Sequence, residues 1–131
     1  MNKRQTIARV LVGLGCLNML AGAMLHLLAG YPRVKSFLAA SNLSAAMQEA
    51  MRAVFLMIGC MWIMVVIVTL IAAFTKTRIR KAIVLFCGLA LLAQIPIWVH
   101  FMGWFIGNEM FLVSAMLIAG GGLLLPPVLS Q

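Results

Sequence analysis

Two histidines are the side chains in this sequence best suited to chemistry. His26 lies within the apolar stretch LNMLAGAMLHLLAGYP (residues 17–32), and His100 lies in a later apolar run that also holds Trp98. Imidazoles from two helices can ligate a haem iron from opposite sides. A histidine can instead donate to a quinone carbonyl surrounded by aromatic rings. A haem or quinone cofactor between His26 and His100 is therefore one hypothesis.

Other polar residues cluster near the same ends of the apolar runs. If the N-terminus is cytoplasmic, both histidines and both acids fall in the outward half of a membrane. We therefore predict a ligand pocket in that half, lined by Asn18, Glu49, Arg52, Gln94, Trp98, Asn108 and Glu109. The alternative is structural: a buried amide or imidazole that bridges two helices contributes roughly 0.6–2 kcal/mol without any further role.

The sequence does not favour an enzyme. Its serines show no acid–histidine order typical of a nucleophilic triad. The triple glycine at 120–122 lies within an apolar run and not in a phosphate-binding loop after a strand. We predict no catalytic residue and no metal site. The three cysteines are predicted to be buried thiols: Cys16, Cys60 and Cys87.

The composition points to a lipid environment. The 131 residues are 65% hydrophobic and only 9% charged, which is too apolar for the surface of a small soluble domain. The charges separate uncharged runs, and a bilayer requires roughly 20 helical residues. We predict one transmembrane domain (1–131), an all-α antiparallel four-helix bundle with spans at about 7–29, 53–74, 82–106 and 110–125.

Local signals refine these spans. Ser44 is a plausible N-cap, so the second helix is expected to begin before the membrane. Pro96 should kink the third span, and Asn108 is expected to cap the fourth. Residues 32–41 resemble a separate interfacial segment.

Small residues recur every three or four positions around Asn18 and His26, which places both on the face that packs against other helices. Asn18 and Gln94 are expected to form interhelical hydrogen bonds. Trp62 lies in the middle of the second span, so its N–H should face the bundle and require an acceptor.

The basic residues predict the orientation. Of the ten Lys and Arg residues, seven lie at the N-terminus or in the segment 76–81: Lys3, Arg4, Arg9, Lys76, Arg78, Arg80 and Lys81. The positive-inside rule then places both termini in the cytoplasm. The net charge of +8 does not indicate a nucleic-acid partner, because the basic residues flank apolar runs and do not interleave with aromatics.

The order of segments also resembles a known group. A short basic N-terminus precedes GLGCLNMLAGAMLHLLAGYP, a longer first loop leads to RAVFLMIG, and a basic loop lies in the middle. This pattern resembles small four-helix bacterial membrane proteins of the DoxX-like type. The resemblance implies a monomer or small assembly in the bacterial inner membrane. It implies no catalytic residue.

Three functions remain open at this level. The first is a non-enzymatic accessory subunit that binds other membrane proteins or a second copy of itself through its helix faces. The second is a haem- or quinone-binding redox module that uses His26 and His100. The third is a transporter of small or lipophilic compounds with a pocket in the outward leaflet.

Overall fold

The computed structural model describes residues 3–126, and helices are its only regular secondary structure in this range, without a strand. The elements are α1 (Lys3–Leu25), a π-helical turn η1 (His26–Gly30), α2 (Tyr31–Ala39), α3 (Ala45–Phe74), α4 (Arg80–Met102) and α5 (Ile106–Leu124). Four helical segments are long and apolar enough to cross a membrane: Lys3–Ala39, Ala45–Phe74, Arg80–Phe101 and Ile106–Leu124. The predicted all-α class is confirmed for the described residues, and so is the presence there of four helices long and apolar enough to cross a membrane.

The first helix continues beyond its predicted end at residue 29. The chain remains helical through η1 and α2 to Ala39, so residues 32–39 are not a separate segment. Pro32 lies in the first turn of α2, directly after the π turn. Proline has no N–H and its ring crowds the preceding turn. A wider π turn, in which Tyr31 N–H bonds to His26 O, offers that ring more room.

The second helix begins where its cap predicts. The Ser44 hydroxyl accepts a hydrogen bond from Met47 N at 3.3 Å, which satisfies one of the free donors of the first turn. The N-cap prediction is confirmed. The long helix α3 therefore reaches well beyond the predicted span of 53–74.

The break between α4 and α5 lies earlier than predicted. Helix α4 ends at Met102, and Gly103 follows with a φ of +73°, a conformation that favours glycine. Helix α5 then starts at Ile106, with Phe105 as its N-cap residue. Asn108 therefore lies inside the first turn. Its predicted role as the N-cap is wrong, and its side chain donates instead to Gly103 O at 2.9 Å.

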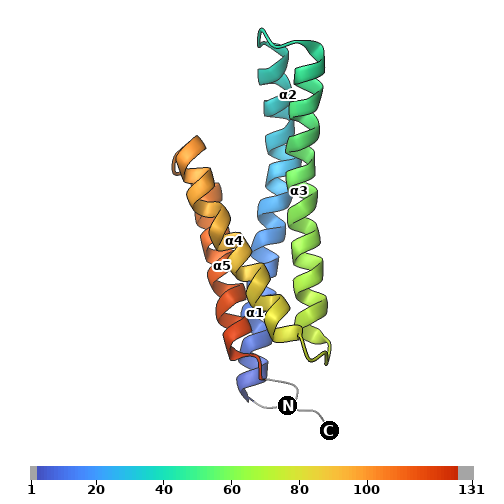
Figure 1. Cartoon of the computed structure of the whole chain (residues 1–131). Coiled ribbons are helices and arrows are strands. Elements are labelled where there is room, and N and C mark those ends of the chain that lie inside the picture. The colour runs from blue at the N-terminus through green and yellow to red at the C-terminus, as the bar shows by residue number, and fades with distance from the viewer. Residues whose placement is uncertain (1–2, 127–131) are drawn as a thin grey trace.

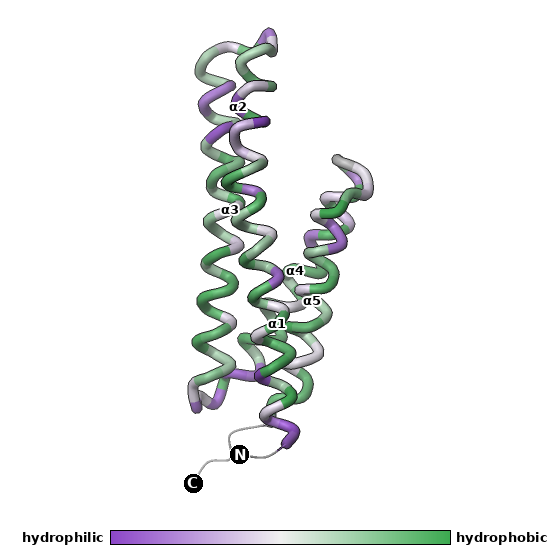
Figure 2. The backbone as a smooth tube through the Cα atoms, turned by 180° about the vertical axis from the view of Figure 1, so that it is seen from behind, coloured by the Kyte–Doolittle hydropathy of each residue, from purple (hydrophilic) through white to green (hydrophobic). Residues whose placement is uncertain are grey.

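The helices form two pairs (Figure 1). The long pair consists of α1–η1–α2 beside α3, and the short pair consists of α4 beside α5. Helix α5 packs against both α1 and α4. The pairs lie close together at the end where α1 begins and α3 joins α4, and they diverge towards the α4–α5 connection (Figures 1 and 2). We call the first the basic end and the other the far end.

Glycines allow the close packing of α5. A Cβ at Gly121 would lie 2.8 Å from Ala8 O, and a Cβ at Gly88 would lie 2.7 Å from Ala119 N. Such distances leave no space for a side chain, so backbones meet directly here, as in small-xxx-small packing. The buried core runs along this contact and includes Val12, Cys16, Val84, Leu91 and Ile118.

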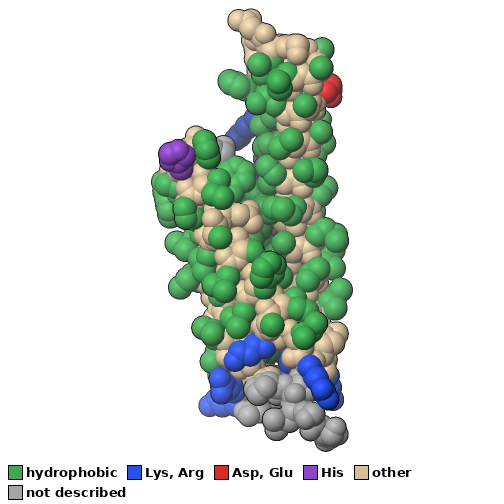
Figure 3. Space-filling view, in the orientation of Figure 1, with side chains coloured by type: hydrophobic (Ala, Val, Ile, Leu, Met, Phe, Trp, Pro, Cys, Tyr) green, Lys and Arg blue, Asp and Glu red, His purple; other side chains and the backbone are tan. Residues whose placement is uncertain are grey.

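The surface separates charge from apolar side chains. Figure 3 shows hydrophobic side chains over the length of the helices and a cluster of Lys and Arg at the basic end, with a further basic side chain visible towards the far end. Cys16 and Cys87 are buried, but Cys60 is exposed on α3. The prediction of a buried thiol is confirmed for the first two and wrong for Cys60, because an apolar helix does not reveal which side faces its neighbours.

Candidate functional site

A cavity of about 1020 Å³ lies where the two helical pairs diverge. The long pair supplies Asn18, His26 and Trp62, while the short pair and its connection supply Trp98 and Asn108. The remaining lining is dominated by apolar side chains. A mostly apolar cavity with a few polar groups is typical of a ligand-binding site.

Asn18 fixes one wall of the cavity. Its Nδ2 donates to Met110 O at 2.8 Å and to Ser114 Oγ at 2.9 Å, and both acceptors belong to α5. The Ser114 hydroxyl donates in turn to Met110 O at 2.8 Å. These bonds join α1 to α5 beside the cavity. The predicted interhelical hydrogen bond of Asn18 is confirmed.

His26 lies in the π turn and faces α3. Its Nε2 is 2.9 Å from Phe55 O, and because a carbonyl oxygen only accepts, we assign the proton to Nε2. In the neutral ring, Nδ1 is then an acceptor. The imidazole stacks on Phe55 with centroids 3.7 Å apart and lies 4.7 Å from the Trp62 ring. Isolated π turns frequently occur at functional sites.

Trp62 provides the clearest unsatisfied group. Its side chain is 5% exposed, and Nε1 has no hydrogen-bond partner among the described residues. Its ring packs edge-on against Phe111 at 4.3 Å and against Trp98 at 6.2 Å. A buried N–H without an acceptor is costly. Trp62 lines the cavity, although its Nε1 atom is itself buried.

Arg33 adds a positive charge to the cavity. It follows Pro32 on α2 and lies in the lining together with Phe37 and with Met47 and Met51 of α3. The cavity lining thus extends from the aromatic rings around Trp62 to Arg33 and the methionine side chains of α3. The sequence interpretation did not assign Arg33 or Phe37 to the site, because it ended the first helix at residue 29.

Four of the predicted site residues meet at the cavity: Asn18, His26, Trp98 and Asn108. Glu49 and Arg52 do not line it. They form an ion pair at 2.6 Å near the start of α3. Glu109 also lies outside the lining, and its carboxylate accepts from Trp104 Nε1 at 3.2 Å.

Gln94 and His100 also lie outside the cavity lining. Gln94 Nε2 donates to Ala90 O at 3.4 Å on its own helix, so the predicted interhelical bond is wrong. His100 is exposed and contacts the edge of Phe101, with centroids 4.8 Å apart. His26 and His100 therefore share no cavity, and a haem held by both finds no support. No group of three His, Cys, Asp or Glu side chains suited to a metal occurs in residues 3–126.

No protein-family model, curated protein or solved structure matches the chain. The resemblance to DoxX-like proteins therefore stays a prediction. The fold and the site define the class only broadly: a helical protein with four helices able to span a membrane and a mostly apolar cavity between two helical pairs.

Proposed function

We propose that this chain is a multi-pass membrane protein, an antiparallel four-helix bundle whose cavity binds a lipophilic molecule that carries a hydrogen-bond acceptor such as a carbonyl. Large apolar side chains are exposed on each long helix, including Leu14, Met57, Phe86 and Met116. Exposing such surface to water costs about 25 cal/mol per Å². A bilayer removes that cost and supports the proposed location.

The basic end is proposed to face the cytoplasm of a bacterial inner membrane. The positive-inside rule supports this orientation, since the basic residues of α1 and of the α3–α4 connection gather there. Both termini are then cytoplasmic. The cavity, which lies towards the far end, falls in the outward leaflet, where a lipophilic molecule can reach it from the bilayer.

One observation carries the ligand proposal: Trp62 lines an apolar cavity, and its buried indole N–H has no acceptor among the described residues. A ligand carbonyl placed there removes the cost of the unsatisfied donor. His26 Nδ1 is an acceptor in the neutral ring, so it can receive a hydrogen bond from a ligand hydroxyl but not bind a carbonyl. A quinone is one molecule with this chemistry, and its carbonyl would accept from Trp62, because the His26 proton is already donated to Phe55 O. Binding of this kind is also the first step of a transporter.

A second function uses the same opening. Met47, Met51 and Met110 contribute to the lining, and methionine surfaces adapt to varied apolar partners. A transmembrane helix of another protein can therefore occupy the space between the pairs. In that case the chain is an accessory subunit, and a partner protein remains bound when the chain is purified in mild detergent.

The test uses the protein in detergent micelles and two probes, a decyl-chain benzoquinone and decylbenzene, which has no acceptor. Trp62→Phe keeps a ring and removes the donor. It should weaken quinone binding about fivefold, the equivalent of about 1 kcal/mol, and leave decylbenzene unchanged. Trp104→Phe is the matched control, because Trp104 is exposed and does not line the cavity. Native mass spectrometry measures both affinities.

A second variant pair tests the cavity itself. Gly22→Leu places a side chain in the lining, where the nearest atom to a new Cβ is Met110 Cε at 3.7 Å. It should abolish binding of both probes. Gly13→Leu adds the same group where no atom lies within 4 Å and should leave binding intact. Failure of the quinone to bind the unmodified chain, or equal effects of the two leucines, would overturn the proposed function.

A further inference from the structure

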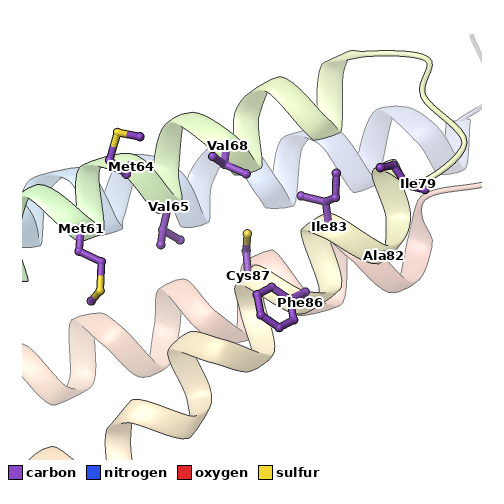
Figure 4. A pocket seen from close by; sticks show the side chains of 9 residues that line it. All are labelled: Met61, Met64, Val65, Val68, Ile79, Ala82, Ile83, Phe86 and Cys87. Atoms are coloured by element: carbon purple, nitrogen blue, oxygen red, sulfur yellow. The ribbon is translucent and has the colours of Figure 1, made fainter.

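A second hollow lies between α3 and α4, towards the basic end. It is a groove of about 550 Å³ and shares no lining residue with the cavity. Its walls are entirely apolar or sulfur-bearing side chains: Met61, Met64, Val65, Val68, Ile79, Ala82, Ile83, Phe86 and Cys87. Figure 4 shows Val65 and Cys87 facing one another across it. The lining offers no oxygen or nitrogen of a side chain, so a polar ligand gains nothing there.

One end of this groove is strongly positive. Ile79 lies in the groove, and its neighbours in the α3–α4 connection are Lys76, Arg78, Arg80 and Lys81. Lys76 and Arg78 are exposed. Both acidic side chains lie elsewhere, Glu49 near the start of α3 and Glu109 in the first turn of α5. No acidic side chain neutralises this connection.

Arg80 adds to the positive potential. It is 4% exposed, and its guanidinium donates to Thr75 O at 3.4 Å and to Pro126 O at 3.0 Å, while Nε has no partner among the described residues. Carbonyl oxygens satisfy donors but do not cancel the charge. A buried cation held in this way favours an anion at the adjacent surface.

We propose that the α3–α4 groove holds an acyl chain of an anionic phospholipid, with the lipid phosphate at Lys76 and Arg78. The apolar groove suits an acyl chain, and the basic residues at its end suit an anionic headgroup. Each basic residue near the membrane surface strengthens the attraction to anionic lipids. The occupant is a lipid of the leaflet at the basic end. The inference rests on the proposed membrane location but not on the cavity ligand.

The headgroup is tested by comparing phosphatidylglycerol with phosphatidylcholine of the same acyl chains. Native mass spectrometry of the full chain should show several-fold tighter binding of phosphatidylglycerol. Lys76→Gln should reduce that binding about fivefold, and K76Q/R78Q should reduce it further. Lys35→Gln removes the same charge at the far end of the molecule and should have no effect. Equal binding of the two lipids, or equal effects of Lys76→Gln and Lys35→Gln, would overturn the proposal.

The acyl chain is tested with two tryptophans on α3. Val68 and Ile71 are both exposed, but only Val68 lines the groove. Val68→Trp should displace phosphatidylglycerol, whereas Ile71→Trp should not. If Val68→Trp instead dissociates a dimer, as measured by light scattering, with no change in lipid binding, a second copy occupies the groove and the proposal fails. Gly22→Leu should leave phosphatidylglycerol binding intact, which separates this result from that of the cavity.

Discussion

The two ends of the molecule differ in how their helices meet. Near the basic end, backbones touch through glycines, and Gly88 and Gly121 leave no room for a side chain. Towards the far end the pairs diverge, and aromatic and polar side chains surround a cavity. Close contacts between small residues hold helices together in lipid. Close backbone contacts therefore fix the two pairs together at one end, and the pairs diverge around the cavity at the other.

The largest effect should come from breaking the close contact between α4 and α5. A Cβ at Gly88 would lie 2.7 Å from Ala119 N and 2.9 Å from its Cα, and backbone atoms cannot move aside. Gly88→Ala should lower the free energy of unfolding by about 1–3 kcal/mol, as measured by denaturation in detergent. Gly120→Ala is the control, because no atom lies within 4 Å of its Cβ, and it should be neutral or slightly stabilising. Equal losses from both would show that the contact is not critical.

A smaller effect is expected where α1 is bonded to α5 beside the cavity. Asn18→Leu removes the hydrogen bonds to Met110 O and Ser114 Oγ. Bonds of this kind contribute about 0.6–1.7 kcal/mol in membrane proteins, so the free energy of unfolding should fall by about 1 kcal/mol. Gln94→Leu removes a bond within one helix and should cause no loss. If Gln94→Leu lowers the free energy of unfolding as much as Asn18→Leu does, the loss does not come from the hydrogen bonds between α1 and α5.

The smallest effect should come from the ion pair near the start of α3. Glu49 and Arg52 are 2.6 Å apart, but the carboxylate side chain is 70% exposed. Exposed pairs contribute roughly 0–1 kcal/mol and weaken with salt. Glu49→Gln should therefore change the free energy of unfolding by less than about 0.5 kcal/mol at low salt. Denaturation at low and high salt measures the difference, and a large loss that persists at high salt would assign this pair a structural role.

Part of the site could be predicted from the sequence, because polar residues are rare in apolar helices. Asn18 and Trp62 could be singled out on that ground. The structure gives Asn18 a bond to another helix, and it buries Trp62 without an acceptor among the described residues. Arg33 and Phe37 were not predicted because the first span was expected to end at residue 29, before Pro32. The π turn that precedes it has no marker in the sequence.

His26 and His100 illustrate what a sequence does not reveal. Their depths along the helices could be estimated by counting residues, and both were assigned to the outward half. Small residues at helical spacing also indicated the packing face for His26. The side of the helix that His100 occupies could not be predicted, because a helix that is apolar all round has no preferred face. The structure directs His26 to Phe55 O and leaves His100 exposed.

The amino-acid sequence by itself determined the number of apolar helices, the clustering of basic residues at the α3–α4 connection and the cap at Ser44, since these depend on local composition and on backbone donors that need a nearby acceptor. Only the tertiary structure decided where the α4–α5 break falls, which side chains line the cavity, and which glycines contact the backbone of another helix. Those features depend on the rotation and divergence of helices about one another, which arise from contacts between residues far apart in the chain.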